Sequence, residues 1–220
     1  MATIQEAGSS ADVEDWFYIG AILLSIGMLF KVAAAPFHFW APDVYEGSPA
    51  LTTALMSTLT KVIAMAAFFK LVGAMNVNLP YSSQTAIIVI SILSMTIGNI
   101  MALKQTNVKR MLAFSGISHA GFMLMTLLAV TTSAGVLLYY ASAYALSGIA
   151  AFAVILYVTK DKDNEDIFNF NGLGKTSPVL AGVLTCSLLS MAGIPIFSGF
   201  FAKVFLFGQM LNAGHIVLVI

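Results

Sequence analysis

The stretch Leu51–Val72, LTTALMSTLTKVIAMAAFFKLV, is apolar along most of its length and carries Lys61 near its centre. About 20 apolar residues suffice for an α-helix to cross a bilayer, so this stretch is predicted to span a membrane. Lys61 lies roughly eleven residues, or ~16 Å, from either end, which is farther than a lysine stem can reach toward the headgroups. A lysine at mid-membrane costs roughly 2.5–3.5 kcal/mol. We therefore expect an ion or proton pathway here rather than a purely structural span.

Two other lysines, Lys31 and Lys203, also interrupt long apolar stretches that contain no acidic residue. Lys203 lies about nine residues from the end of its stretch, which places it too deep for its amine to reach the headgroups easily. Lys31 lies close to Pro36, where its amine could reach the membrane edge, so its case is weaker. The structural alternative for all three is a lysine paired with an acid from another subunit.

Composition places the chain among polytopic membrane proteins. It has 220 residues, of which 59% are hydrophobic and 9% charged, with a mean hydropathy of +0.92, whereas a soluble domain carries about a quarter charged residues. A net charge of zero and the lack of a basic motif argue against nucleic acid as a partner. The single Cys186 has no disulfide partner and is expected to be a small core residue. No metal-ligand cluster, phosphate-binding glycine loop or nucleophile triad occurs, so we expect no redox centre, metal or cofactor in this chain.

Six apolar segments are predicted to form helices, and the polar Met1–Asp15 precedes them. They are Trp16–Ala35, Ala50–Val72, Thr85–Leu103, Met111–Val130, Ala134–Val158 and Pro178–Leu211. A seventh begins near His215 and reaches Ile220, where no membrane domain should end, so we expect the C-terminus to be truncated. The domain prediction is a polar external segment over residues 1–15 and a membrane domain over 16–220. All of this favours an all-α helix bundle.

Basic residues in short loops predict the orientation, because they stay on the cytoplasmic side of the membrane. Two polar connections carry them, and both should be cytoplasmic; the residues concerned are Lys104, Lys109, Arg110, Lys160, Lys162 and Lys175. The acidic N-terminal segment would then be external. Asp43 and Glu46 are expected at the cytoplasmic interface as helix caps or salt-bridge partners, and Asp161–Asp166 as a solvated loop.

Two spans carry a proline beside a lysine: Pro36 follows Lys31, and Pro195 precedes Lys203. Proline removes a backbone donor and frees a carbonyl, and irregular backbone at membrane depth persists only where it is buried in protein or lines a wet cavity. Discontinuous helices at matching places in two halves indicate a transport site. We therefore predict two broken transmembrane helices, one at each proline.

Two histidines are weaker candidates for the same pathway. His119 lies in mid-span and His38 beside the first break, but a lone histidine in an apolar helix is more often a hydrogen-bonded core residue. His215 lies nearer a terminus, and the spacing does not support haem ligation. The expected mechanism is stepwise: burial favours the neutral amine and a nearby carboxylate favours the ammonium, so movement of that carboxylate loads or unloads a lysine. Water, hydroxyl groups and histidine would join the lysines.

The run from Phe30 to Pro49, FKVAAAPFHFWAPDVYEGSP, resembles subunit N of the proton-pumping NADH:quinone oxidoreductase, respiratory complex I. Three more motifs agree in order and spacing, and the resemblance covers nearly everything from Trp16 onward; they are STLTK at 57–61, LKQTNVKRMLAFS at 103–115, and AGIP to GFFAK over 192–203. PDVYEG, at 42–47, is the most specific element.

The resemblance implies an antiporter-like fold with inverted helix repeats and one broken helix in each. It also implies roles for the candidate residues: Lys31 and Pro36 match the first broken helix, Lys61 the central lysine, Pro195 and Lys203 the second broken helix and its outward half-channel, and His38 and His119 further family positions. Members of the family are roughly twice as long. The helices that precede the first break carry a glutamate that pairs with these lysines, so this chain would hold the end of a first repeat and most of a second.

The predicted function is therefore a proton-translocating subunit of NADH:quinone oxidoreductase in the inner (plasma) membrane. The resemblance implies other complex I membrane subunits and the lipid bilayer as partners, with FMN, iron–sulfur clusters and quinone on other subunits. One alternative is a subunit of a multisubunit cation/proton antiporter of the Mrp type, against which the VYEG element at 44–47 argues. The other is a membrane scaffold without transport, in which the lysines pair with partner acids.

Overall fold

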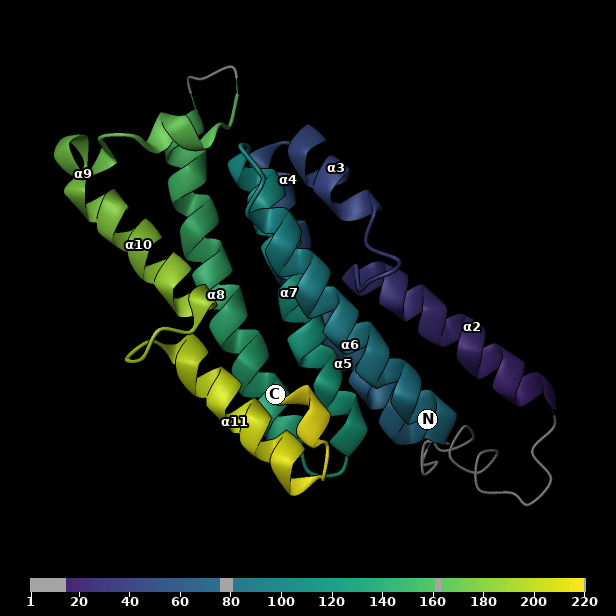
Figure 1. The fold of residues 1–220 in the computed structure, drawn as a ribbon. Coiled ribbons are helices and arrows are strands. Elements are labelled where there is room, and N and C mark those ends of the chain that lie inside the picture. Colours follow the sequence, from purple (N-terminus) through teal and green to yellow (C-terminus); the bar gives the residue numbers. More distant parts are fainter. Residues whose placement is uncertain (1–14, 76–80, 161–163, 220) are drawn as a thin grey trace.

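The computed structural model describes residues 15–75, 81–160 and 164–219, and those residues form an elongated bundle of helices (Figure 1). The long helices that correspond to predicted apolar segments are α2 (Asp15–Val32), α6 (Tyr81–Ala102), α7 (Val108–Leu124) and α8 (Ala134–Thr159). A composite helix runs through α4 (Ala50–Leu55), the π-helix η1 (Met56–Thr60) and α5 (Lys61–Ala74). The last pair is α10 (Pro178–Ala192) and α11 (Ser198–Asn212).

Short elements connect these helices or follow the last of them. They are α3 (Trp40–Gly47), α9 (Leu173–Thr176) and three 3-10 turns, η2 (Met125–Ala129), η3 (Ile167–Phe170) and η4 (Ile216–Leu218). Within the described ranges no strand forms, and the one isolated β-bridge pairs Asn107 with Asp166. That bridge places the α6–α7 connection and the segment after α8 at the same end of the bundle, as the two basic loops were predicted to be.

Within the described residues, four helices are long and apolar enough to cross a membrane: Ala50–Ala74, Ser83–Ala102, Val108–Ala129 and Ala134–Thr159. Two shorter apolar helices, Tyr18–Val32 and Pro178–Ala192, complete the set of predicted segments. Apart from the interruption within Pro178–Leu211, the predicted ends lie within a few residues of the observed ones.

The helix Val108–Ala129 occupies the centre of the bundle. Its most apolar window is 78% buried, against 17% for Ser83–Ala102, which lies at the edge and packs closely against it. Two glycines permit that close approach: a Cβ added to Gly98 would lie 2.7 Å from the Phe114 carbonyl oxygen, and one on Gly121 would lie 2.8 Å from that of Ser91. In Figure 1, α2 lies on one side of this centre and α10 and α11 on the other.

Both predicted breaks coincide with interruptions of helix. Helix α2 ends at Val32 and α3 begins at Trp40, and α10 ends at Ala192 before α11 begins at Ser198. Each interruption contains a non-glycine residue with positive φ, Ala33 at 57° and Ile196 at 92°. Such backbone is strained and needs support from its surroundings. At the first interruption, the Ala35 N–H donates to the Ser94 hydroxyl at 2.9 Å.

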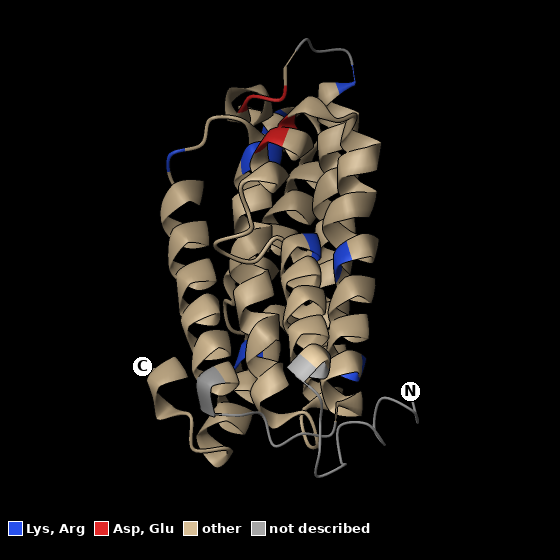
Figure 2. Ribbon diagram, turned by 90° about the vertical axis from the view of Figure 1, so that its right-hand side faces the viewer, with Lys and Arg blue, Asp and Glu red and all other residues tan. Residues whose placement is uncertain are grey.

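Figure 2 shows how charge is distributed along the bundle: the acidic residues gather at one end, whereas basic residues also occur farther along the helices. The sequence between Glu46 and Asp161 contains no acid at all, nor does the sequence after Asp166. The interior of the bundle therefore holds cations without carboxylates on the same helices.

Candidate functional site

Lys61 is buried in the interior, with 2% of its surface exposed. It is the first residue of α5, directly after the π-helix η1. A π-turn inserted in an α-helix is rare and occurs frequently at functional sites. Among the described residues, the Lys61 Nζ has no hydrogen-bond partner and no ion pair. Of the three buried side-chain polar atoms without a hydrogen-bond partner among the described residues, the Lys61 Nζ is the one that belongs to an amine.

Gly116 of α7 provides the space that the Lys61 amine occupies. A Cβ added to Gly116 would lie 2.7 Å from Lys61 Nζ and 3.0 Å from the hydroxyl oxygen of Tyr144, so both groups reach the same point beside α7. The Tyr144 hydroxyl donates to the Ser57 carbonyl of η1 at 3.1 Å. Tyr144 therefore provides a donor for a carbonyl of the π-helix and brings a second polar group beside the lysine.

His119 lies one turn beyond Gly116 on α7 and is 6% exposed. Its Nδ1 makes a 2.8 Å hydrogen bond with the Tyr140 hydroxyl of α8, and its ring centre lies 4.8 Å from that of Tyr144. The ring centre of Phe122 lies 6.4 Å from that of His119. This histidine is both hydrogen-bonded in the core, as the structural interpretation predicted, and adjacent to the polar groups around Lys61.

Lys203 of α11 lies against the C-terminal end of α10. Its Nζ donates to the carbonyl oxygens of Met191 at 3.3 Å and Ala192 at 2.9 Å, and it lies 5.0 Å above the centre of the Phe122 ring. The last carbonyls of a helix have no partner within the helix and carry partial negative charge. The interruption at Gly193, whose φ of 83° suits glycine, exposes those carbonyls to the amine.

The structure thus brings together Lys61, His119 and Lys203 through the aromatic residues between them. It does not join Lys31 or His38 to that group, since neither a hydrogen bond nor an aromatic contact among the described residues links them to it. Lys31 is exposed in the last turn of α2. His38 is 7% exposed and its Nδ1 has no partner within the described ranges. Pro36 and Pro195 lie in the two interruptions of helix.

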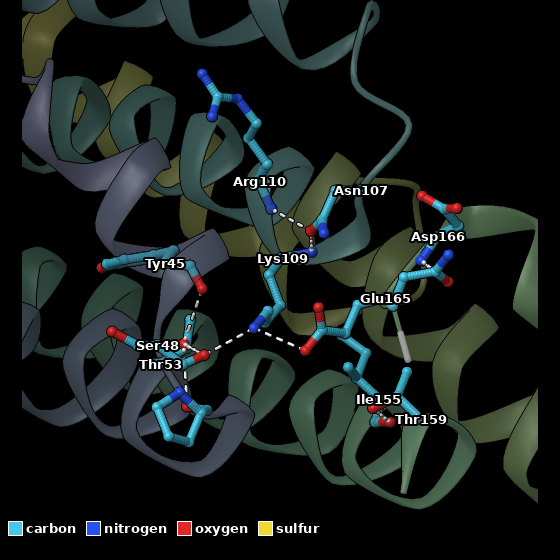
Figure 3. A network of polar contacts seen from close by, with 12 residues as sticks. Tyr45, Ser48, Thr53, Asn107, Lys109, Arg110, Ile155, Thr159, Glu165 and Asp166 are labelled. Carbon is cyan, nitrogen blue, oxygen red and sulfur yellow. Dashed lines mark hydrogen bonds and ion pairs between the residues drawn. The ribbon is translucent and has the colours of Figure 1, made fainter. Parts of the chain in front are cut away.

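Figure 3 shows a polar network that the sequence did not predict, centred on Lys109 at the start of α7. This lysine is 2% exposed; its Nζ lies 2.8 Å from a Glu165 carboxylate oxygen and donates to the Ser48 carbonyl at 2.7 Å. The Glu165 carbonyl also accepts the Val108 N–H at 2.9 Å. The prediction of a solvated loop over Asp161–Asp166 is therefore wrong for Glu165, which docks on the first turn of α7; residues 161–163 lie outside the described ranges.

The neighbouring Arg110 binds the acids of α3. Its guanidinium lies 2.7 Å from both Asp43 and Glu46, which confirms the predicted salt-bridge role of these two residues. Asn107 caps α7, because its side-chain oxygen accepts the backbone N–H groups of Lys109 and Arg110. A lysine two residues after a capping residue, with an acid in another polar loop, is a sequence signal that could have indicated this network. Among the described residues, no group of three or more His, Cys, Asp or Glu side chains could hold a metal.

Comparison with known proteins gives consistent results. A family model described as NADH:quinone oxidoreductase/Mrp antiporter, TM matches residues 3–220. The NADH-quinone oxidoreductase subunit N of Flavobacterium johnsoniae is 67% identical, over 100% of this chain and 49% of that protein. The chain therefore spans about half the length of the curated relatives it matches.

Two solved structures share the fold. A chain of respiratory complex I from Thermus thermophilus with bound aureothin superposes with a TM-score of 0.82 at 33% identity, over 96% of this chain and 47% of that one. A chain of the Mrp complex from Dietzia sp. gives 0.88 at 26% identity, over 98% and 40%. The predicted fold class, an all-α polytopic membrane protein with an antiporter-like bundle, is confirmed.

Proposed function

Because the chain belongs to the NADH:quinone oxidoreductase/Mrp antiporter transmembrane family, we propose that it is part of a proton-translocating subunit of NADH:quinone oxidoreductase. The similarity to subunit N of Flavobacterium johnsoniae over the whole chain supports this assignment. Electron transfer would occur on other subunits, which would hold FMN, iron–sulfur clusters and quinone. Other membrane subunits of the complex and lipid would be its partners.

The observation that carries the proposal is the buried Lys61 amine without an acceptor. A lysine that served only to stabilise the fold would be expected to have a carboxylate or carbonyl partner, because an unpaired buried charge is costly. Here the partner is absent from the described residues, so it has to come from a neighbouring segment or subunit. An intramembrane ionisable residue of this kind is a functional-site hypothesis by default.

The proposed mechanism follows from the proton or positive charge that each group can carry. A carboxylate that approaches Lys61 stabilises the ammonium, and its withdrawal leaves a buried cation that tends to lose its proton. His119 lies next along the pathway and can accept that proton on its imidazole, with Tyr144 and Tyr140 alongside. Lys203 lies beyond, where the carbonyls of the α10 terminus stabilise a positive charge without neutralising it.

The proposed orientation of the chain in the membrane follows from the positions of its basic residues. We place the chain in the inner (plasma) membrane, with the Lys109 end of the bundle facing the cytoplasm and the N-terminal segment outside. Each helix interruption would act as a discontinuous transmembrane helix, with Lys31 and His38 at the first and Lys203 at the second. Lys31 is exposed on the described surface, which leaves its amine accessible to a partner segment.

A Lys61→Ala substitution in the assembled complex tests the function. We expect NADH-driven proton translocation to fall while the complex still assembles and reduces quinone. Lys70→Ala is the matched control, because Lys70 lies on the same helix α5 but is exposed. Normal proton pumping by the Lys61 variant would contradict the proposal and favour a membrane scaffold in which the lysines only pair with partner acids.

The Mrp-type antiporter is the second candidate, and the superposition on the Dietzia complex favours it. The two are separated by resolving native membranes on a gel stained for NADH dehydrogenase activity and mapping peptides. Peptides of this chain in the active band support the complex I assignment. Their absence from that band, together with sodium-dependent transport that needs no NADH, would support the antiporter.

A further inference from the structure

Three serine hydroxyls form a chain across the three helices nearest the second interruption. The Ser147 hydroxyl of α8 donates to the Ser190 hydroxyl of α10 at 3.0 Å. The Ser190 hydroxyl lies 3.3 Å from the Ser198 hydroxyl at the start of α11. Ser190 also accepts the Gly199 N–H at 3.3 Å. The hydroxyl chain therefore runs from the bundle interior into the interruption itself.

These contacts differ from the usual behaviour of serine in a membrane helix. A serine hydroxyl normally donates to a carbonyl one turn earlier in its own helix, and Ser187 of α10 does so, at 2.6 Å from the Val183 carbonyl. Ser147 instead donates to a hydroxyl on another helix, although both it and Ser190 are buried. Each hydroxyl in such a chain can accept one proton as it donates another.

A small cavity adjoins the inner end of this chain. Its volume is about 10 Å³, at the lower limit for one water molecule. The groups that line it include polar side chains from α7, α8 and α10, as a bound water requires, and small residues that leave the space open: His119, Tyr140, Ala143, Tyr144, Ser147, Ser190, Met191, Gly199 and Ala202. The cavity thus lies between the imidazole and the first hydroxyl of the chain.

We propose that this cavity binds a single water, and that Ser147 and Ser190 pass protons between His119 and the second helix interruption. This inference rests on the proposed function, because it names the groups that carry protons from His119 to the second helix interruption. In each transfer the imidazolium gives its proton to the water, and the water gives one to Ser147. Ser147 then gives its proton to Ser190, and Ser190 to Ser198, which is exposed at the interruption and releases one proton to water there. Each hydroxyl gains one proton and loses one, and rotation of the O–H bonds then restores the starting orientation of the chain.

The test compares Ser147→Thr with Ser147→Val in the assembled complex. The two side chains have nearly the same shape, but only threonine keeps a hydroxyl. We expect the valine variant to pump protons at least about tenfold more slowly than the threonine variant, because a positioned proton-transfer group contributes about that much or more. Ser187→Ala, which removes a buried hydroxyl bonded within α10, should pump like the native complex.

Equal proton pumping by the threonine and valine variants would overturn the inference. If Ser147→Val fails to assemble, Ser190→Ala carries the test, because it makes a buried side chain smaller; pumping equal to that of Ser187→Ala then overturns it. Lys61→Ala in the same series separates the proposed function from the role of the serine chain. If Lys61→Ala loses proton pumping while the serine variants keep it, the proposed function is supported and only the role of the serine chain is refuted.

Discussion

The buried ion pair between Lys109 and Glu165 leads to a prediction about stability. In a Glu165→Ala variant, the Lys109 ammonium, 2% exposed, would keep the Ser48 carbonyl at 2.7 Å but lose the carboxylate at 2.8 Å. Removing one partner of a buried ion pair costs about 3–5 kcal/mol, because the other charge is left uncompensated. The Glu165 side chain is 26% exposed, so water can enter and we expect the low end, about 3 kcal/mol.

The reverse substitution should cost less. Lys109→Met fills the volume of the lysine stem and leaves the carboxylate, which water already reaches, so we expect about 1–2 kcal/mol. The double variant removes both charges and should lose less stability than the two single variants added together. Asp43→Ala is the exposed control: its side chain is 70% exposed and Arg110 retains Glu46, so the loss should stay below about 1 kcal/mol.

The measurement is the denaturant midpoint at which the chain leaves the detergent-solubilised complex, for each variant and for the native protein. The expected order of destabilisation is Glu165→Ala, then Lys109→Met, then Asp43→Ala. A Glu165 variant no less stable than the Asp43 variant would refute the reasoning, because it would mean that the ammonium is solvated as freely as a surface charge.

Three further substitutions test other parts of the structure by the same denaturation or by assembly. Asn107→Ala removes the N-cap of α7 and should cost about 1 kcal/mol, most of which Asn107→Ser should recover; equal losses would contradict capping. Gly199→Ala should prevent assembly on a native gel, because its Cβ would overlap the Ser190 carbonyl, whereas Gly182→Ala, with open space around it, should assemble. Tyr144→Phe should cost about 1 kcal/mol by removing its hydrogen bond to η1, and an unchanged midpoint would argue against that bond.

Much of the fold could be predicted from apolar length and proline position. Ala134–Val158 was expected as a helix and Ala134–Thr159 is one, and the interruption around Pro195 falls where proline and glycine are adjacent in the sequence. The π-helix η1 could not be predicted, because nothing in the sequence Met56–Thr60 distinguishes a π-turn from a turn of α-helix. Its extra residue per turn is accommodated by side-chain hydrogen bonds, such as that from Tyr144, which only the packed structure brings close.

The site was predictable in part. Apolar surroundings single out Lys61, Lys203 and His119, because a charged or polar group there is costly whatever its neighbours are. The partners could not be found in the same way: Tyr144 and Ser190 are common residues in apolar helices, and their roles depend on distances between helices. Lys109 could not be singled out for the opposite reason, since nothing distinguishes a buried lysine in a polar stretch from a solvated one.

Lys61 and Lys109 show why burial alone does not identify a functional lysine. Both are 2% exposed. The Lys109 ammonium has a carboxylate at 2.8 Å and a carbonyl at 2.7 Å, so its charge is compensated within the structure. These contacts link the start of α7 to the segments that contain Ser48 and Glu165. The Lys61 amine lies beside Gly116 with neither kind of acceptor within the described residues. A group whose charge nothing nearby fixes can respond to a carboxylate that arrives from outside, and this is the property that proton transfer requires.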